Sequence, residues 1–120
     1  MTKIGGYVLI TTPNMLSWFN RVLVPLGVQP LFVEPSTRSK LVGAGILKGL
    51  KKEPQPVGHI RIQTIASLSD MLIMNGFEVV KVQGAVYDAG LPRIIWPIDR
   101  LFAHITPLCS HMMVLARKVK

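Results

Sequence analysis

The chain has 120 residues, enough for one small domain, and its 49% hydrophobic and 17% charged residues are typical of a globular protein with a core, which excludes a disordered segment. The one cysteine, Cys109, excludes an internal disulfide and a cysteine-based zinc site, and predicts a small core residue. A net charge of +8, from 14 basic and 6 acidic residues, suits a polyanion or an acidic surface as partner.

No membrane span or secretory signal is expected. The longest uncharged run, Ile4–Asn20, is interrupted by two glycines and by Pro13 and Asn14, so it falls short of the roughly 18 apolar residues that a membrane helix needs. The apolar stretch after Lys3 ends at Thr11, before it reaches the length of a signal peptide. We therefore predict a cytoplasmic protein without a transmembrane segment.

The first predicted element is a strand. Tyr7–Ile10 is short, apolar and bounded by two glycines before it and by Pro13 after it, a pattern typical of a strand that is covered on both faces. The polar residues Thr11–Asn14 then lie at the carboxyl end of this strand, where open α/β sheets place their ligands.

A helix and a long irregular segment are predicted next. Asn14 is a good helix N-cap, and apolar residues at helical spacing predict a helix over Met15–Val24. Ser36–Gly58 is polar, basic and rich in glycine, which predicts a lid with one helical turn around Leu41–Leu50. No aromatic residue is interspersed with the cations from Arg38 to Arg61, so the sequence disfavours binding to nucleic acid.

His59 and Arg61 form the segment of greatest chemical interest. If the chain is extended here, both side chains share one face, with Ile60 buried on the other. A histidine has a pKa suited to taking a proton from an attacking hydroxyl or amine, and an arginine suits an anionic group. The alternative is structural: His59 caps the next helix and Arg61 pairs with a surface acid.

The rest of the chain alternates helices and strands. A helix capped at Thr64 or Ser67 is predicted to end at Asn75-Gly76, with Ser67 and Asp70 as a capping pair. A strand over Glu78–Tyr87 follows, with Gly84 as the site of a bulge and Val80, Val82 and Val86 on one face. Pro97 begins a helix whose buried stripe is Ile98, Leu101, Phe102 and Ile105, and the last predicted strand is His111–Arg117.

These features together resemble one protein family. The glycine pair, the apolar strand, Thr12-Pro13-Asn14, the later His59-Ile60-Arg61, and a helix ending at Asn75-Gly76-Phe77 are similar to the carboxyl-terminal half of Rossmann-like S-adenosylmethionine-dependent methyltransferases, of the kind called methyltransferase type 11. The resemblance implies an α/β fold with the last three strands of that sheet. In it the final strand is antiparallel and lies between the Gly6–Thr11 strand and the Glu78–Tyr87 strand.

The resemblance also implies a function and a division of the chain. Residues 1–120 would be a single partial domain, with a strand and acceptor-side loop (1–14), a helix and variable lid (15–58), and a helix, strand, helix and strand (59–120). His59 would be a possible catalytic base, and Thr12, Asn14 and Arg61 would bind the methyl acceptor. S-adenosylmethionine is the cofactor of the intact family, but its binding half precedes this region, so no cofactor or metal is expected for this chain alone.

Three hypotheses about partners follow. The chain would be the acceptor half of a methyltransferase, inactive without its upstream half; or a non-catalytic paralogue that docks on a full-length methyltransferase; or a basic module that binds anionic polymers. Because the family's neighbouring strand is absent, the edge of Tyr7–Ile10 is predicted to be open and to promote self-association.

Overall fold

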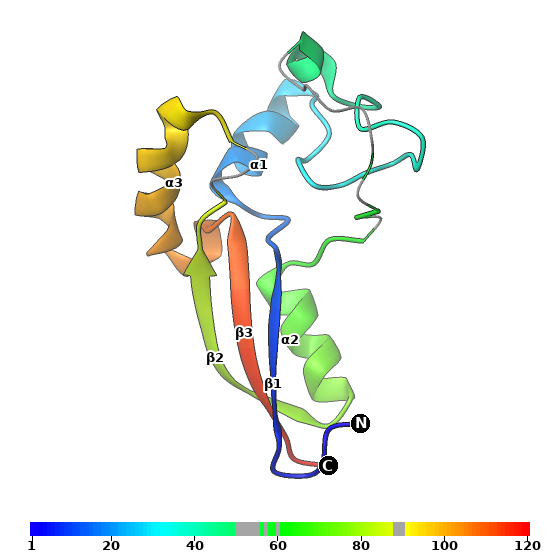
Figure 1. The fold of residues 1–120 in the computed structure, drawn as a ribbon, viewed down its shortest axis with the longest axis vertical. Coiled ribbons are helices and arrows are strands. Elements are labelled where there is room, and N and C mark those ends of the chain that lie inside the picture. The colour runs from blue at the N-terminus through cyan, green and yellow to red at the C-terminus, as the bar shows by residue number, and fades with distance from the viewer. Residues whose placement is uncertain (50–55, 57, 60, 88–90) are drawn as a thin grey trace.

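The computed structural model describes residues 1–49, 56, 58–59, 61–87 and 91–120. The fold is mixed α/β, with a three-stranded sheet made of β1 (Tyr7–Pro13), β2 (Phe77–Ala85) and β3 (His111–Lys118). The strand order is β1-β3-β2, and β3 pairs antiparallel with both neighbours. β1 and β2 therefore run parallel to each other on either side of the last strand (Figure 1). This confirms the predicted strand order.

Helix α2 (Ile65–Met74) covers one face of the sheet and forms the core with it. Leu68 and Leu72 are buried against alternate residues of β3. The β3 residues in this core are Met112, Val114 and Ala116. Val8 and Ile10 of β1 pack against the same core.

The opposite face of β1 is exposed. Tyr7 is 58% and Leu9 66% solvent-accessible, so the prediction that both faces of this strand are covered is wrong for this chain. The apolar run that suggested two covered faces in fact alternates between the α2 side and solvent.

Helix α1 (Trp18–Leu23) starts later than predicted. The Asn14 side chain does not cap it, because Asn14 Oδ1 accepts the backbone N–H of Leu16 at 3.0 Å and closes a turn there. A 3₁₀ turn, Val24–Leu26, follows, and another at Gly45–Gly49 occupies the predicted helical turn of the lid. Of the rest of the predicted lid, residues 36–44, 56 and 58 form no helix or strand, and residues 50–55 and 57 lie outside the described residues.

The ends of α2 follow the sequence closely, with one correction. Thr64 is the N-cap, and its capping box is completed by Ser67, not by Ser67 with Asp70. At the other end Gly76 adopts the expected left-handed conformation, with φ +76°.

In β2 the predicted bulge is misplaced. The register of β2 against β3 shifts between Val79 and Lys81, so Val80 is turned out to solvent, while Val79 and Val82 pack on the core. Gly84 has another role. A Cβ at this position would collide with the carbonyl oxygen of Ala103, so glycine permits the close approach of the two backbones.

Helix α3 (Trp96–Ala103) differs most from expectation. Three of the four residues predicted to be buried, Ile98, Leu101 and Ile105, are exposed, whereas Asp99 is fully buried. Among the described residues no helix is long and apolar enough to cross a membrane.

Candidate functional site

The candidate site lies beyond the carboxyl ends of β1 and β2, where α1, the start of β3 and residues 58–59 and 61–63 meet (Figure 1). Asn14, directly after β1, anchors this region. Its Nδ2 donates to the carbonyl oxygen of Cys109 at 2.9 Å and its side chain is buried. Because both ends of the Asn14 amide are bonded within the chain, its contribution is to hold the loop in place.

The segment that contains Arg61 runs beside this loop. Gln63 forms a parallel bridge with Asn14, and its carbonyl oxygen accepts the backbone N–H of Met15 at 3.0 Å. Arg61, two residues earlier, is exposed, and Thr12 is half-buried on β1. The predicted residues thus belong to neighbouring segments at one end of the sheet. The expected burial of Ile60 lies outside the described residues.

A buried carboxylate fixes the backbone of His59. Glu34 Oε2 accepts the backbone N–H groups of Gly58 at 2.6 Å and His59 at 2.9 Å, and the backbone N–H of Glu34 donates to the carbonyl oxygen of His59. These bonds connect the Pro30–Pro35 region to residues 58–59. Glu34 thus positions His59, a role that its place in the sequence did not indicate.

A second buried carboxylate, Asp99 of α3, joins three elements. Its Oδ1 accepts the indole N–H of Trp18 at 2.9 Å, and its Oδ2 accepts the backbone N–H of Tyr87 at 2.7 Å and the hydroxyl of Ser110 at 3.0 Å. Asp99 therefore fixes α1, the end of β2 and the start of β3 relative to one another. A carboxylate with no exposed surface is stable here because several donors surround it.

His111, the first residue of β3, lies in an aromatic cluster at this end of the sheet. Its ring stacks on Tyr87, with centroids 4.7 Å apart, and meets the edge of Phe32 at 5.4 Å. Burial lowers the pKa of His111; the charge of Asp99 opposes this shift, and the nearby His59 adds to it. The imidazole of His111 is therefore neutral at pH 7.

The two ring nitrogens of His111 differ in their surroundings. Nδ1 is buried and has no hydrogen-bond partner among the described residues. An imidazolium needs an acceptor for each N–H, so this dry Nδ1 also favours the neutral ring. His111 is therefore a neutral member of the aromatic cluster, close enough to His59 to feel its charge.

Sequence reasoning missed Asp99, Tyr87 and His111 as members of this site. Asp99 reaches Trp18 across 81 positions in the chain, and no local spacing indicates such a contact. The only available signal was the rarity of an acid among apolar residues in a short helix.

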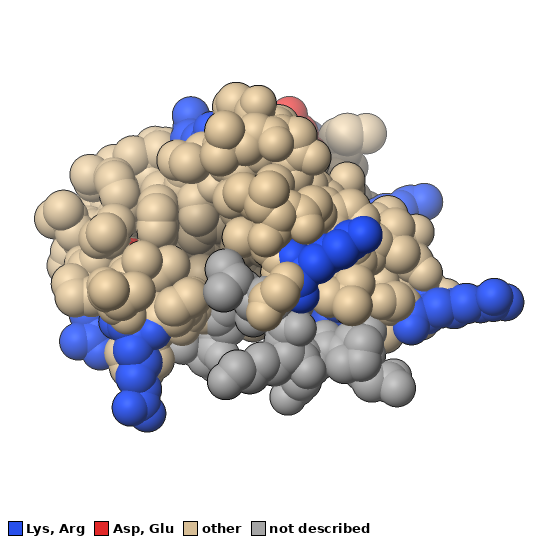
Figure 2. Space-filling model, turned by 90° about the horizontal axis from the view of Figure 1, so that it is seen from above, with Lys and Arg blue, Asp and Glu red and all other residues tan. Residues whose placement is uncertain are grey.

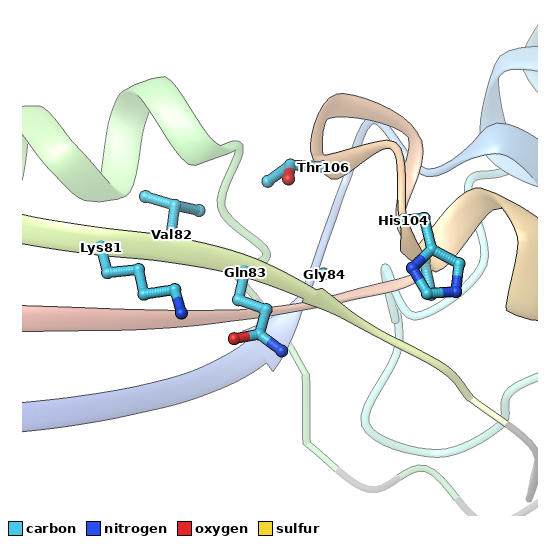
Figure 3. Close-up of a pocket in the computed structure, with 7 residues that line it drawn as sticks. Lys81, Val82, Gln83, Gly84, His104 and Thr106 are labelled. Atoms are coloured by element: carbon cyan, nitrogen blue, oxygen red, sulfur yellow. The ribbon is translucent and has the colours of Figure 1, made fainter.

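A separate shallow pocket of about 330 Å³ lies on the outer edge of β2 and contains none of the four predicted site residues. Lys81 and Gln83 project from one side of the strand and Val82 from the other, with His104 beyond the strand's end (Figure 3). The pocket is open to solvent and its lysine is exposed, so it does not enclose a ligand.

The described residues contain neither a cluster of metal ligands nor a reactive thiol. No group of three or more His, Cys, Asp or Glu residues there is placed to hold a metal ion. Burial raises the pKa of the Cys109 thiol, which Asn14 also contacts, so Cys109 is a protonated core residue as predicted.

No protein-family model, curated protein or solved structure matches this chain.

Proposed function

We propose that this chain is the carboxyl-terminal, acceptor-side part of a Rossmann-like S-adenosylmethionine-dependent methyltransferase. The observation that carries the proposal is the strand order β1-β3-β2, in which the last strand runs antiparallel between two parallel ones. The resemblance implies this arrangement, which local periodicity does not predict. The strand order is therefore the point on which the structure and the resemblance agree.

In this proposal the acceptor lies at the carboxyl end of β1. His59 takes the proton that the acceptor hydroxyl or amine loses, and Arg61 pairs with an anionic group of the acceptor. Thr12 contributes a hydroxyl from β1. Asn14 supports the loop through Cys109 and does not offer its amide to a ligand, since both ends of that amide are already bonded.

The described residues do not fit S-adenosylmethionine. The methyl donor needs a glycine-rich turn between a strand and a helix, and an acid for the ribose hydroxyls. β1 leads into Asn14 without glycine, and the turn Gly45–Gly49 follows no strand. Glu34 and Asp99 are buried and already accept protein donors. The donor site would therefore lie outside the described residues.

The edge of β1 that faces away from β3 could pair with a strand of the donor-binding half. It supports equally the alternative in which this chain is a non-catalytic paralogue that docks on a full-length methyltransferase. Among the described residues β1 pairs with β3 on one side only, and Tyr7 and Leu9 are exposed on its free face. An upstream methyltransferase half, or a full-length methyltransferase, would add a strand to this edge and cover this face.

Co-purification with a transfer assay tests the proposal. We expect the tagged chain, expressed in its native cells, to co-purify with a protein that binds S-adenosylmethionine. The complex should transfer a labelled methyl group, and His59→Asn should reduce transfer about a hundredfold. His104→Asn, which changes an exposed histidine on the β2 side, is the matched control.

The outcomes separate the hypotheses. A complex that binds S-adenosylmethionine and retains full activity with His59→Asn would make this chain a docking paralogue. If no protein that binds S-adenosylmethionine co-purifies with the chain under conditions that preserve weak complexes, both the acceptor-half hypothesis and the docking-paralogue hypothesis are contradicted.

A further inference from the structure

Phe32 adopts a backbone conformation that normally belongs to glycine. Its φ is +73°, and it is the one non-glycine residue in the left-handed region among the described residues. The backbone N–H of Val33 donates to the carbonyl oxygen of Pro30 at 3.2 Å, so Phe32 is the third residue of a tight turn. A left-handed third residue defines a type II turn, where glycine or asparagine is usual. A phenylalanine there is strained, and such strain persists only where other contacts hold it.

Ring contacts hold Phe32 in this turn. Its ring is nearly perpendicular to that of Tyr87, with centroids 4.6 Å apart, and to that of His111, with centroids 5.4 Å apart. Because Tyr87 and His111 are stacked on each other, the Phe32 ring lies along the side of this stack. The buried Phe19 is a third neighbour, at 5.8 Å. These contacts offset the strain of the turn.

The histidine of this stack lacks a hydrogen bond. Nδ1 of His111 is buried and has no partner among the described residues. Buried N–H groups without an acceptor are rarer than buried acceptors without a donor, so we assign the proton of the neutral ring to Nε2. Nδ1 is then an acceptor that lacks a donor, and the phenylalanine ring beside it supplies none.

A planar aromatic compound with a hydroxyl or an amine has what this cluster lacks. Its ring can make the same contacts with Tyr87 and His111 that the Phe32 ring makes. In addition, its O–H or N–H can donate to Nδ1 of His111. Phe32, Tyr87 and His111 are each half-buried, so the cluster borders on solvent. When the Phe32 ring leaves, the strain of the turn is released.

The surroundings of the cluster suit an uncharged compound. Figure 2, which views this end of the molecule, shows a described surface that is mostly neither acidic nor basic, from which Lys and Arg side chains project. The carboxylates of Asp99 and Glu34 are buried and already accept protein donors. They are therefore not available to a cationic ligand, and a neutral ring fits better.

We propose that the Phe32 ring is a plug, and that a phenol or aryl amine displaces it and binds against Tyr87 and His111. The hydroxyl or amine of this compound donates to Nδ1 of His111. The inference rests on the proposed function in one respect only, in that it makes this compound the methyl acceptor. Binding itself requires no methyl transfer.

Binding of para-cresol to the purified chain at pH 7 tests the proposal. The nitrogen resonance of Nδ1 of His111 in NMR reports a donated hydrogen bond, and its shift with concentration gives the Kd. We expect a saturable shift. The methyl ether of para-cresol lacks the donor, and cyclohexanol lacks the planar ring. Each should bind at least about tenfold more weakly, because one hydrogen bond or one ring contact is worth about this factor.

Two variants distinguish a plug from a wall of the site. Phe32→Gly removes the ring and accepts the left-handed backbone, so para-cresol should bind at least about tenfold more tightly. If Phe32→Gly does not fold, Phe32→Asn replaces it, because asparagine also tolerates this conformation. Tyr87→Leu removes the ring on which the ligand packs and should weaken binding at least about tenfold.

Phe77→Leu is the matched control. Phe77 packs on the core with α2, away from the plug, so its replacement should leave the Kd for para-cresol unchanged. Circular dichroism verifies the fold of each variant.

Three results would overturn the proposal. One is an Nδ1 resonance that does not shift in the wild-type chain or in Phe32→Gly. Another is weaker binding by Phe32→Gly than by the wild-type chain, which would make Phe32 a wall of the site. The third is equal binding of para-cresol and its methyl ether, which would show that no hydrogen bond is made.

Failure of the proposed function gives a different result. If para-cresol binds as expected but no complex of this chain transfers a methyl group, the binding site stands and the methyltransferase proposal falls. If a complex transfers methyl groups while the chain does not bind para-cresol, only the plug proposal is refuted.

Discussion

Asp99 is the side chain whose loss should destabilise the protein most. Asp99→Ala leaves the donors of Trp18 and Tyr87 without their acceptor, while the Ser110 hydroxyl keeps the carbonyl oxygen of Ala85 at 3.2 Å. Each such donor costs roughly 1–3 kcal/mol, so with two donors affected we expect the free energy of unfolding in urea to fall by about 2 kcal/mol or more. Asp70→Ala, at an exposed site on α2, is the control. Equal stabilities of the two variants would show that the Asp99 bonds contribute little.

The two histidines of the site should be coupled. Because the charge of His59 lowers the pKa of His111, His59→Asn should raise the pKa of His111. Titration of the ring protons by NMR measures this directly, and His104→Asn should leave the value unchanged. A His111 pKa that does not respond to His59→Asn would mean that the two rings are too far apart to share a proton.

The lowered pKa of His111 also predicts how stability depends on pH. The unfolded chain, with an ordinary value near 6.5, binds a proton there before the folded chain does. Stability should therefore rise with pH from the folded-state pKa up to about 6.5 and then level off. Urea unfolding at a series of pH values measures this dependence. In His111→Gln the free energy of unfolding should change less with pH over this range. An unchanged slope would assign the dependence to other groups.

At the level of elements, β1 should make the chain self-associate. Among the described residues only β3 pairs with β1, so its other edge offers backbone groups for a further strand, and Leu9 adds an exposed aliphatic side chain. Leu9→Lys should reduce the apparent mass in light scattering at low micromolar concentration while leaving thermal stability nearly unchanged. Thr11→Lys on the same face is a second test. A wild-type monomer with protected amides along Tyr7–Ile10 would show that another segment covers the edge.

The elements that could be predicted are those whose signals are local. Gly76 ends α2, and the strands around His111–Lys118 and Phe77–Ala85 follow from composition and turns. The orientation of α3 could not be predicted, because its aliphatic periodicity favours burial of the face that is exposed in the structure. The long-range bonds of Asp99 decide between the faces. The strand order came from the resemblance and not from periodicity.

The candidate site divides in the same way. The position of Asn14 after β1 followed from the strand-end rule. The environment of His59 did not, since it depends on Glu34, which is 25 positions away. His111 and Tyr87 meet only because β2 and β3 pair, so the aromatic cluster became visible only with the register of the sheet.

For the whole molecule, we predict that the chain alone does not bind S-adenosylmethionine at micromolar concentration. The described strands provide neither the glycine-rich turn nor the acid that this ligand requires, and each unpaired polar group costs roughly 1–3 kcal/mol on burial. Isothermal titration calorimetry is the measurement. One-to-one micromolar binding by the purified chain would refute the half-enzyme proposal, and binding only in the presence of a partner would support it.

The central place of β3 in the sheet has a consequence for synthesis. In the described part of the chain β1 and β2 each pair with β3 and not with each other, so neither gains this partner until residues 111–118 have been made. The sheet must then form at once, through contacts between β1 and β3 that close a loop of about a hundred residues, which is intrinsically slow. We expect the apolar residues of β1 to stay exposed during this interval, which favours aggregation of the nascent chain.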